Sequence, residues 1–262
     1  MADHATKKIP VSVCLISGAE AHRIARALES VAAWSSEIVV VLNSDVTDGT
    51  DALATRFGAK VFRESWKGFI AQKQSAAEKA TQPWLLNLDA DEAVTPELAS
   101  EIAGVVTNPA PPHAAYEFPR LTFYCGNWIR HGDWYPDRVL RLWQRGKAHW
   151  AGQEPHAKLQ VAGTIGRLRS DVLHYTNENI ARQIGKIVPY QTASVKQCLE
   201  KGKSAGWFQM VFRPAWRFFR AYVLRLGFLD GWRGFYIAAL NAFSVLTRYA
   251  IVREARQEKN PD

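Results

Sequence analysis

Three carboxylates follow a short apolar run, and their types and spacing suit the binding of a metal ion. The run is Trp84 to Leu88, and Asp89, Asp91 and Glu92 come directly after it. Alternate side chains of an extended chain point to the same face, so Asp89 and Asp91 should face one side together. Two converging carboxylates without a basic neighbour in the sequence are costly unless a cation lies between them. Mg²⁺ is typically held by one or two carboxylates and substrate phosphates, which predicts a divalent-cation site; a solvated acidic turn is the alternative.

Segments typical of β-strands alternate with helical patterns through residues 1–107, and this alternation would position the carboxylates. The predicted strands are residues 11–16, 37–42, 60–62 and 84–88. Strands separated by helices in this way are typical of right-handed βαβ units on a parallel sheet. Ligands bind at the carboxyl ends of such strands. Three polar clusters lie at those ends and predict a shared site: Ser17 to Glu20, Asn43 to Asp48, and Asp89 to Glu92.

The texture of the chain changes after a stiff break at Asn108 to Pro112, and the following part suits a polyhydroxylated ligand. Its short predicted strands are residues 116–123, 138–143, 158–161 and 168–174. Large aromatic residues are frequent there: Trp128, Trp134, Tyr135, Trp143 and Trp150. Aromatic rings pack on the C–H faces of sugars, and interleaved carboxylates accept hydrogen bonds from sugar hydroxyls.

The positive charge is concentrated towards one end of the chain. Of the net charge of +8, residues 203–253 carry +7, from eight Lys or Arg and one acid, Asp230. A nucleic-acid binder would place its basic residues on a recognised motif, so we expect no nucleic-acid partner. Three widely separated cysteines indicate neither a disulfide framework nor a zinc site, and they favour a reducing compartment. The apolar run after Lys7 and Lys8 is too short and too broken for a signal peptide.

Residues 176–262 are predicted to form an amphipathic helical region. Apolar residues recur there at helical spacing beside a basic stripe: Phe212, Trp216, Phe219, Val223 and Leu226 with Arg213, Arg217 and Arg220. Pro214 should lie in the first turn, and Gly227 to Gly234 should break the helix. The longest uncharged stretch, residues 234–247, has 14 residues, fewer than the ~20 that span a bilayer. We therefore expect a cytoplasmic protein that is peripheral on the anionic inner face of the cell membrane; helices packed on the rest of the protein are the alternative.

Six motifs lie in a characteristic order along the chain. They are Val11 to Ile16 with Glu20, Thr47 to Thr50, Gly68-Phe69 with Gln72-Lys73, Leu88 to Glu92, Trp134 to Leu142, and Leu173 to Tyr175. Together they resemble family 2 glycosyltransferases, and within that family most of all the lipopolysaccharide-core glucosyltransferase group. The resemblance covers about residues 10 to 250. The glycine fingerprint of dinucleotide-binding folds does not follow the first predicted strand, which argues against a dehydrogenase.

The resemblance implies a GT-A fold, which is a Rossmann-like α/β domain with a mostly parallel sheet, a small mixed β acceptor region and a C-terminal helical appendage. The implied catalytic domain is residues 1–175, with a donor half at 1–107 and an acceptor half at 115–175. By resemblance, a nucleotide-diphosphate sugar would be bound by Glu20, Asn43, Asp48, Lys73 and Asp89. The family commonly has Asp where Asn43 stands and Asn where Ala19 stands, which leaves the nucleobase open.

The implied reaction is a metal-dependent, inverting transfer of a sugar to a membrane-associated glycolipid such as lipopolysaccharide core. Mg²⁺ or Mn²⁺ held by Asp89 and Asp91 would neutralise the departing diphosphate, with His174 completing the metal shell. A carboxylate would take the proton of the acceptor hydroxyl; Glu154 is the first choice and Asp137 the second. A sugar-phosphate nucleotidyltransferase and a non-catalytic binding protein of the same fold are the alternatives.

Overall fold

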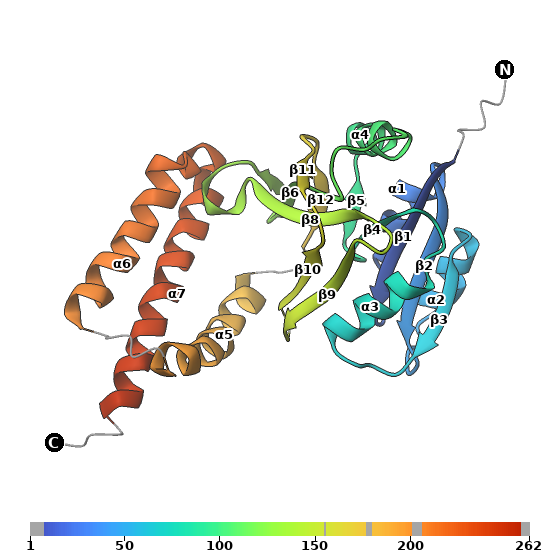
Figure 1. The fold of residues 1–262 in the computed structure, drawn as a ribbon. Helices are drawn as coiled ribbons and strands as arrows, with labels where there is room; N and C mark the ends of the chain where they lie inside the picture. Colours follow the sequence, from blue (N-terminus) through green and yellow to red (C-terminus); the bar gives the residue numbers. More distant parts are fainter. Residues whose placement is uncertain (1–7, 155, 177–179, 201–205, 258–262) are drawn as a thin grey trace. The chain divides into compact units, whose positions relative to one another are not determined.

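The structure is a computed structural model that describes residues 8–154, 156–176, 180–200 and 206–257. Its contacts divide the chain into two units, residues 1–120 with 138–175 and residues 121–137 with 176–262. The first unit ends at residue 175, the same residue at which the sequence analysis placed the end of the catalytic domain. Residues 121–137 group with the C-terminal helices, whereas the sequence analysis placed them in the acceptor half. Figure 1 shows the elements of both units.

The first unit contains a parallel sheet with the strand order β3-β2-β1-β4. Its elements alternate along the chain as β1 (Ile9–Ser17), α1 (Ile24–Ala32), β2 (Ser35–Asn43), α2 (Thr50–Arg56), β3 (Lys60–Glu64), α3 (Phe69–Lys79) and β4 (Trp84–Asn87). The three strand pairs are all parallel, which confirms the prediction. Val39, Val40 and Val41 are fully buried, because parallel strands covered on both faces must be apolar on both sides.

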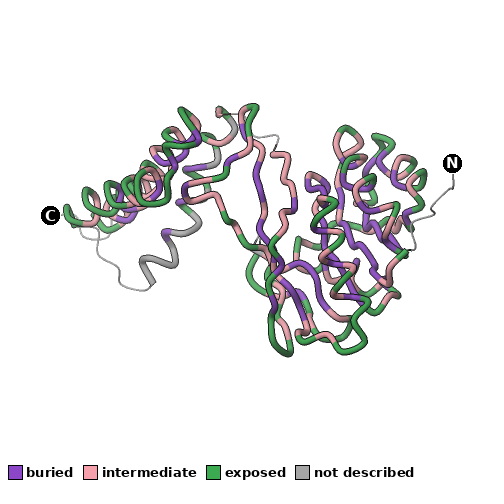
Figure 2. The backbone as a smooth tube through the Cα atoms, turned by 90° about the horizontal axis from the view of Figure 1, so that it is seen from above, coloured by how far each residue is buried: buried purple, intermediate pink, exposed green. Residues whose placement is uncertain are grey.

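Successive residues of these strands enter two separate cores. Val40 and Leu86 belong to a core that includes buried residues of α1, α2 and α4 (Pro96–Val106). Their chain neighbours Val41 and Leu85 belong to a second core with Ala76 of α3. This separation follows from the alternation of side chains along a strand. Figure 2 shows the strands of this unit as largely buried, with the exposed residues on the surrounding helices and loops.

The chain then extends the sheet with short, mainly antiparallel strands. They are β5 (Glu92–Val94), β6 (Ala115–Tyr124), β8 (Asp137–Gln144), β11 (Ile165–Arg167) and β12 (Val172–Tyr175), while β9 (Ala148–Gln153) and β10 (His156–Val161) form a separate hairpin. Strand β8 runs antiparallel to β4, and β12 runs antiparallel to β5. Strands β5, β9 and β11 were not predicted from the sequence; β5 and β11 have three residues each, too few to show an alternation. Helix α4 begins as predicted, with the Thr95 hydroxyl accepting from the Leu98 amide and Pro96 as the first helical residue.

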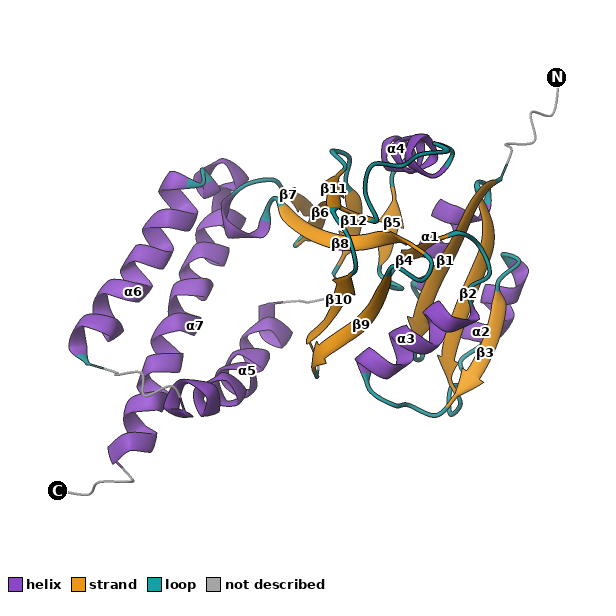
Figure 3. Ribbon diagram, viewed as in Figure 1, coloured by secondary structure: helices purple, strands orange, loops and turns teal. Residues whose placement is uncertain are grey.

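The second unit consists mainly of helices, which in its described part are α5 (Ile180–Glu200), α6 (Trp207–Phe219) and α7 (Gly231–Gln257). A short strand, β7 (Asn127–Ile129), pairs with the end of β6, and the 3₁₀ turn η1 (Gly132–Trp134) follows it. A π-helical turn, η2 (Arg220–Leu224), and a 3₁₀ turn, η3 (Gly227–Asp230), connect α6 to α7. Helices α6 and α7 pack along each other (Figure 3). Gly234 permits a close approach at this connection, since a Cβ there would lie 1.8 Å from the carbonyl oxygen of Gly227.

Two boundaries in the second unit differ from the prediction. Helix α6 begins at Trp207, so Pro214 lies inside the helix and not in its first turn. The interruption between the helices covers residues 220–230, and α7 already begins at Gly231. The apolar stripe predicted from Phe212 onward begins earlier in the structure. Trp207 and Phe208 precede it on α6, and they were not part of the predicted stripe.

One helical stretch of the described chain is long and apolar enough to cross a membrane. It covers Gly227–Gln257, and 22% of its most apolar window is buried inside the structure. Only its length and composition identify this stretch, and core helices of water-soluble proteins can have the same length and composition. The sequence analysis expected a helix on the membrane surface from the short uncharged stretch, and that expectation stays a prediction.

Candidate active site

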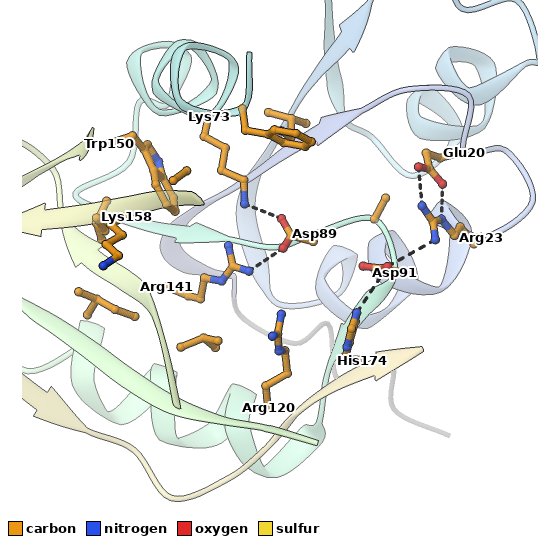
Figure 4. Close-up of a pocket in the computed structure, with 17 residues that line it drawn as sticks. Glu20, Arg23, Lys73, Asp89, Asp91, Arg120, Arg141, Trp150, Lys158 and His174 are labelled. Carbon is orange, nitrogen blue, oxygen red and sulfur yellow. Dashed lines mark hydrogen bonds and ion pairs between the residues drawn. The ribbon is translucent and has the colours of Figure 1, made fainter. Parts of the chain in front are cut away.

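A cavity of about 810 Å³ lies in the first unit, against the carboxyl ends of its central strands. Figure 4 shows the charged residues that line it, which come from the loop that joins β1 to α1, from α3, the β4–β5 turn, β6, β8, β10 and β12. Two of the three polar clusters predicted at the strand ends reach this cavity, through Glu20 and through Asp89 and Asp91. Asn43 and Asp48, from the remaining cluster, are not among its lining residues.

Asp89 is held between two cations at the floor of the cavity. Its Oδ1 accepts from Lys73 Nζ at 2.8 Å, and its Oδ2 accepts from Arg141 Nη2 at 2.5 Å. Helix α3 supplies the lysine and β8 supplies the arginine, and each cationic side chain is only 10% exposed. The pKa of Asp89 lies well below its usual range: burial acts to raise it, but Arg141 and Lys73 outweigh burial. The acidic cluster has no basic neighbour in the sequence, but in the structure Lys73 and Arg141 lie beside it.

Lys73 was predicted to contact the donor, and the structure places it in the cavity wall. Burial lowers the pKa of Lys73, and the carboxylate of Asp89 acts in the opposite direction. Its Nζ also lies 5.1 Å from the ring centroid of Trp150, which lines the same cavity. A cation so placed is fixed in position, and this suits the binding of an anionic group such as a diphosphate.

Asp91 faces a different set of partners. Its Oδ2 lies 3.6 Å from His174 Nε2 and 3.4 Å from Arg23 Nη1. Arg23 in turn is paired with Glu20. His174 reaches this position because β12 runs antiparallel to β5, in a register that pairs His174 with Glu92. The pKa of Asp91 is lowered overall, since hydrogen bonding and charge from His174 and the charge of Arg23 outweigh the effect of burial.

The residues present suit a divalent cation at Asp91 and His174 better than at Asp89. Both oxygens of Asp89 are engaged by cations at 2.8 and 2.5 Å, whereas Asp91 faces a cation, Arg23, through Oδ2 alone and at 3.4 Å. The same Oδ2 lies 3.6 Å from His174 Nε2, close enough for both atoms to contact one ion. Within the described residues there is no group of three or more His, Cys, Asp or Glu that could hold a metal ion. The protein would therefore contribute about two ligands, and the others would come from water and substrate phosphates, as is common for Mg²⁺.

Glu154, the first choice for a catalytic base, caps helix α3 in this structure. Its two carboxylate oxygens accept from the backbone amides of Phe69 and Ile70, at 3.0 and 2.9 Å. Gly68 has a φ of +92°, and a Cβ there would lie 2.7 Å from Glu154 Oε1, so glycine allows this contact. Glu154 does not line the cavity, but Phe69 does. Glu154 therefore contacts Phe69, which lines the cavity, but is not itself a lining residue.

Asp137, the second choice for the base, is the first residue of β8. It belongs by its contacts to the second unit and is not among the cavity-lining residues. Val139, two residues further along the strand, does line the cavity. The assignment of a base to either carboxylate stays a prediction.

The two donor-binding residues predicted after β2 have separate structural roles. Asp48 accepts from the amides of Thr50 and Ala21, both at 3.0 Å, and so joins the start of α2 to the loop after β1. Asn43 ends β2, and its buried Oδ1 has no hydrogen-bond partner among the described residues. An unpaired buried acceptor is costly unless a ligand or water donates to it.

Several cationic residues of the site were not predicted from the sequence. Arg23, Arg120, Arg141 and Lys158 line the cavity together with Lys73, so five cationic side chains face three carboxylates. Arg141 lies within a motif that carried the family resemblance, but nothing in that motif identified its partner. The acidic cluster was itself a usable signal, because converging buried carboxylates require positive charges from elsewhere in the fold.

Comparison with known proteins shows the family of the chain. The family model described as "Glycosyl transferase family 2" matches residues 12–160, more than half of the chain. The chain belongs to glycosyltransferase family 2. It is 30% identical to an uncharacterized glycosyltransferase of Rickettsia bellii, over 100% of this chain and 91% of that protein. It is 28% identical to the lipopolysaccharide core biosynthesis glycosyltransferase LpsC of Rhizobium meliloti, over 93% of this chain and 94% of that protein.

Solved structures give the fold of this family 2 member. S. aureus TarS, residues 1–349, crystallised with UDP-GlcNAc, superposes with a TM-score of 0.52 at 12% identity, over 95% of this chain and 92% of that chain. At this identity the likeness concerns the fold alone, which is the GT-A fold that the sequence predicted. The predicted family and enzyme class are thereby confirmed, since the family 2 match and the named relatives are glycosyltransferases.

Proposed function

We propose that this family 2 glycosyltransferase transfers a sugar from a nucleotide-diphosphate sugar to a membrane-associated glycolipid, with inversion and with the help of Mg²⁺ or Mn²⁺. The observation that carries the proposal is the placement of Asp91 and His174 beside a cation-rich cavity at the strand ends. A diphosphate needs positive charge on its oxygens, and the cavity supplies it from several elements of the fold.

The donor diphosphate would occupy the part of the cavity lined by Lys73 and Arg141. Asp89 fixes both cations by ion pairs, so they are ordered before the substrate binds. Preordered charges stabilise a developing anion without a reorganisation cost during the reaction. TarS, whose structure contains UDP-GlcNAc, supports a nucleotide-sugar donor for a protein of this fold. In this assignment Asp89 acts as a positioning residue.

Asp91 and His174 would hold the divalent cation. When bound there, the cation would act as a Lewis acid that neutralises the leaving diphosphate. Arg23 keeps its pairing with Glu20, and this pairing directs the Arg23 guanidinium to within 3.4 Å of Asp91. The chain's own contribution at this position is therefore to orient one carboxylate and one imidazole towards a single point.

The acceptor would enter past aromatic side chains at the N-terminus of α3. The rings of Trp66 and Phe69 form an edge-to-face pair with centroids 4.8 Å apart, and they are 49% and 42% exposed. Exposed aromatic faces are suitable platforms for sugar rings. Glu154 contacts the same helix end, and we assign it the role of base that the sequence predicted, with Asp137 as the alternative. The relative LpsC, named for lipopolysaccharide core biosynthesis, supports a glycolipid acceptor.

Asp91→Asn tests the metal assignment directly. Replacing the carboxylate with an amide removes the anionic ligand, so we expect metal-dependent sugar transfer or donor hydrolysis to fall by at least about 100-fold. Thermal unfolding with nucleotide sugars and Mn²⁺ measures binding in parallel, since a ligand at 100 times its Kd adds about 2.7 kcal/mol of stability. Glu29→Gln, an exposed acid on α1, is the matched control.

Retained metal-dependent activity in Asp91→Asn would contradict the metal site. Donor binding without any transfer in the wild-type protein, across acceptors extracted from membranes, would favour the non-catalytic binding protein instead. A stabilising effect of nucleotide sugars that is the same with and without Mn²⁺ would show that the cations of the cavity suffice to hold the diphosphate.

A further inference from the structure

A second charge cluster lies in the helical unit, where one buried carboxylate meets three arginines. Asp133, in η1, has a side chain that is 2% exposed. Its oxygens lie 2.9 Å from Arg217 Nε, 2.7 Å from Arg220 Nη2 and 3.1 Å from Arg225 Nη1. These four residues, called the Asp133 cluster below, belong to one unit although Asp133 lies far from the three arginines in the sequence.

The Asp133 cluster carries more positive than negative charge. One carboxylate opposes three guanidinium groups, which leaves two positive charges fixed close together. The nearby acid Asp230 is occupied, because it accepts from the amide of His131 at 2.9 Å and lies 3.0 Å from the His131 ring. Like charges held together favour an added anion. Guanidinium groups also bind phosphates through two parallel hydrogen bonds.

The cluster is fixed by the backbone around it. The amide of Gly132 donates to the carbonyl oxygen of Arg225 at 2.8 Å, so η1 is attached to the turn that carries this arginine. Arg220 and Arg225 lie at the two ends of the π-helical turn η2, which ends with the Arg225 amide donating to the carbonyl of Arg220 at 2.9 Å. The arginine side chains are 35–47% exposed, so part of each remains accessible to a ligand.

Exposed apolar side chains adjoin each arginine along the chain. Trp216 precedes Arg217, Phe219 precedes Arg220, and Leu224 and Leu226 flank Arg225; these four apolar residues are 44–57% exposed. Of the 20 large hydrophobic residues that are exposed in the described chain, 15 lie between Trp207 and Leu246. A site for a free phosphate ion gains nothing from such neighbours, whereas a site at a lipid surface does.

We propose that the Asp133 cluster binds the phosphate of an anionic phospholipid headgroup, while the adjoining apolar side chains enter the outer part of the acyl layer. The proposal goes beyond sugar transfer and assigns residues to the membrane contact of the helical unit. Charge complementarity selects the anionic lipid, and the exposed aromatic residues select a bilayer over a soluble phosphate.

The test measures binding of the full-length protein to vesicles by flotation. Vesicles of phosphatidylcholine with about 30 mol% phosphatidylglycerol provide the anionic surface, and pure phosphatidylcholine is the neutral comparison. The variant Arg217→Gln with Arg225→Gln leaves Arg220 to neutralise Asp133. Two arginines near an anionic leaflet correspond to about a 25-fold change in partition, so we expect a loss of that order.

The control variant removes the same charge from the same unit outside the cluster. Arg213→Gln with Arg253→Gln is suitable, because these arginines lie over the rings of Tyr249 and Trp207. Because these cations are engaged by aromatic rings and lie outside the cluster, we expect this variant to lose less than about threefold in partition. Equal losses in the two double variants would overturn the proposal, because they would show that only the diffuse charge matters. Equal wild-type binding to neutral vesicles would also overturn it.

Two further measurements distinguish a lipid site from its alternatives. Arg217→Lys with Arg225→Lys keeps the charge but removes the forked donors, so we expect intermediate binding, and wild-type binding would contradict a built site. Inorganic phosphate should not displace the protein from vesicles at concentrations where nucleotide binding is unaffected; displacement would indicate a soluble-phosphate site. Thermal stabilisation by nucleotide sugars, recorded on every variant, should stay at the wild-type value, which separates failure of this proposal from failure of the proposed transferase function.

Discussion

Each of the two units holds a carboxylate among several cations, and the surroundings of the two carboxylates differ. In the first unit Asp89 is paired with Lys73 and Arg141, whose side chains are each 10% exposed. In the second unit Asp133 is almost completely buried, but its three arginines are 35–47% exposed. The cations paired with Asp89 are therefore largely shielded from solvent, whereas the arginines paired with Asp133 are partly exposed.

This difference teaches that the neighbours of a charge cluster decide what it can bind. Around Asp89 the neighbours are the walls of a cavity that carries five cationic side chains, which suit a highly charged, water-soluble anion. Around Asp133 the neighbours include exposed Trp216 and Phe219, which suit an extended surface with an apolar interior. Ion pairing positions the cations in both units, and the excess positive charge remains available to a ligand.

Removing either carboxylate is the strongest way to test this comparison. Asp89→Asn would leave the buried Lys73 without its ion-pair partner, while Arg141 would still face Glu92 at 3.5 Å, so we expect the free energy of unfolding to fall by about 3 kcal/mol. Asp133→Asn should cost only about 1 kcal/mol, because its arginines are partly solvated. Urea unfolding of both variants provides the measurement. A larger loss for Asp133→Asn would mean that the more exposed cluster, and not the more shielded one, depends on its carboxylate.

The pH dependence of the free energy of unfolding offers a second test, and it concerns the first unit. Glu37 is buried in it, and although burial acts to raise its pKa, hydrogen bonds from Lys60, Ser12 and Thr81 lower the pKa to about 2. A depressed pKa in the folded state contributes stability above the unfolded value of about 4.5, and this contribution is lost as the pH falls towards 2.

We expect this group to contribute about 3 kcal/mol at pH 7 and almost nothing at pH 2. Chemical unfolding of wild type and Glu37→Gln at both pH values should therefore show a stability difference that narrows in acid. A difference of the same size at pH 7 and pH 2 would show that Glu37 acts by packing and not by its charge. Lys60→Gln, which removes one partner of Glu37, should give a smaller difference with the same pH trend.

A third test asks which carboxylate is the catalytic base. Glu154 contacts the helix end beside the cavity, whereas Asp137 groups with the second unit. We expect Glu154→Gln to slow transfer by about 100-fold without changing donor affinity, and Asp137→Asn to slow it by much less. Steady-state kinetics with donor titrations give both quantities. If Asp137→Asn is the slower enzyme, Asp137 is the base and Glu154 serves as a helix cap alone.

Much of the first unit could be predicted from the sequence because its signals are local. The apolar runs and helical spacings up to residue 107 predicted the parallel βαβ arrangement, and Thr95 with Pro96 predicted the start of α4. Such patterns depend on neighbours within one or two turns of chain, so they can be read without knowledge of the fold. Asp89 and Asp91 both line the cavity, but they lie in the turn between β4 and β5, so the alternation of an extended chain is not the reason that they share it.

The partners of the charged residues were decided only by the tertiary structure. Asp89 meets Lys73 and Arg141 across 16 and 52 residues of chain, and Asp133 meets Arg220 across 87. His174 reaches Asp91 through the antiparallel register of two short strands, one of which the sequence did not reveal. Residue types and local periodicity determined the elements and the acidic motif. Long-range packing determined which charges oppose each other, because register and helix placement are set by the whole core and not by any single segment.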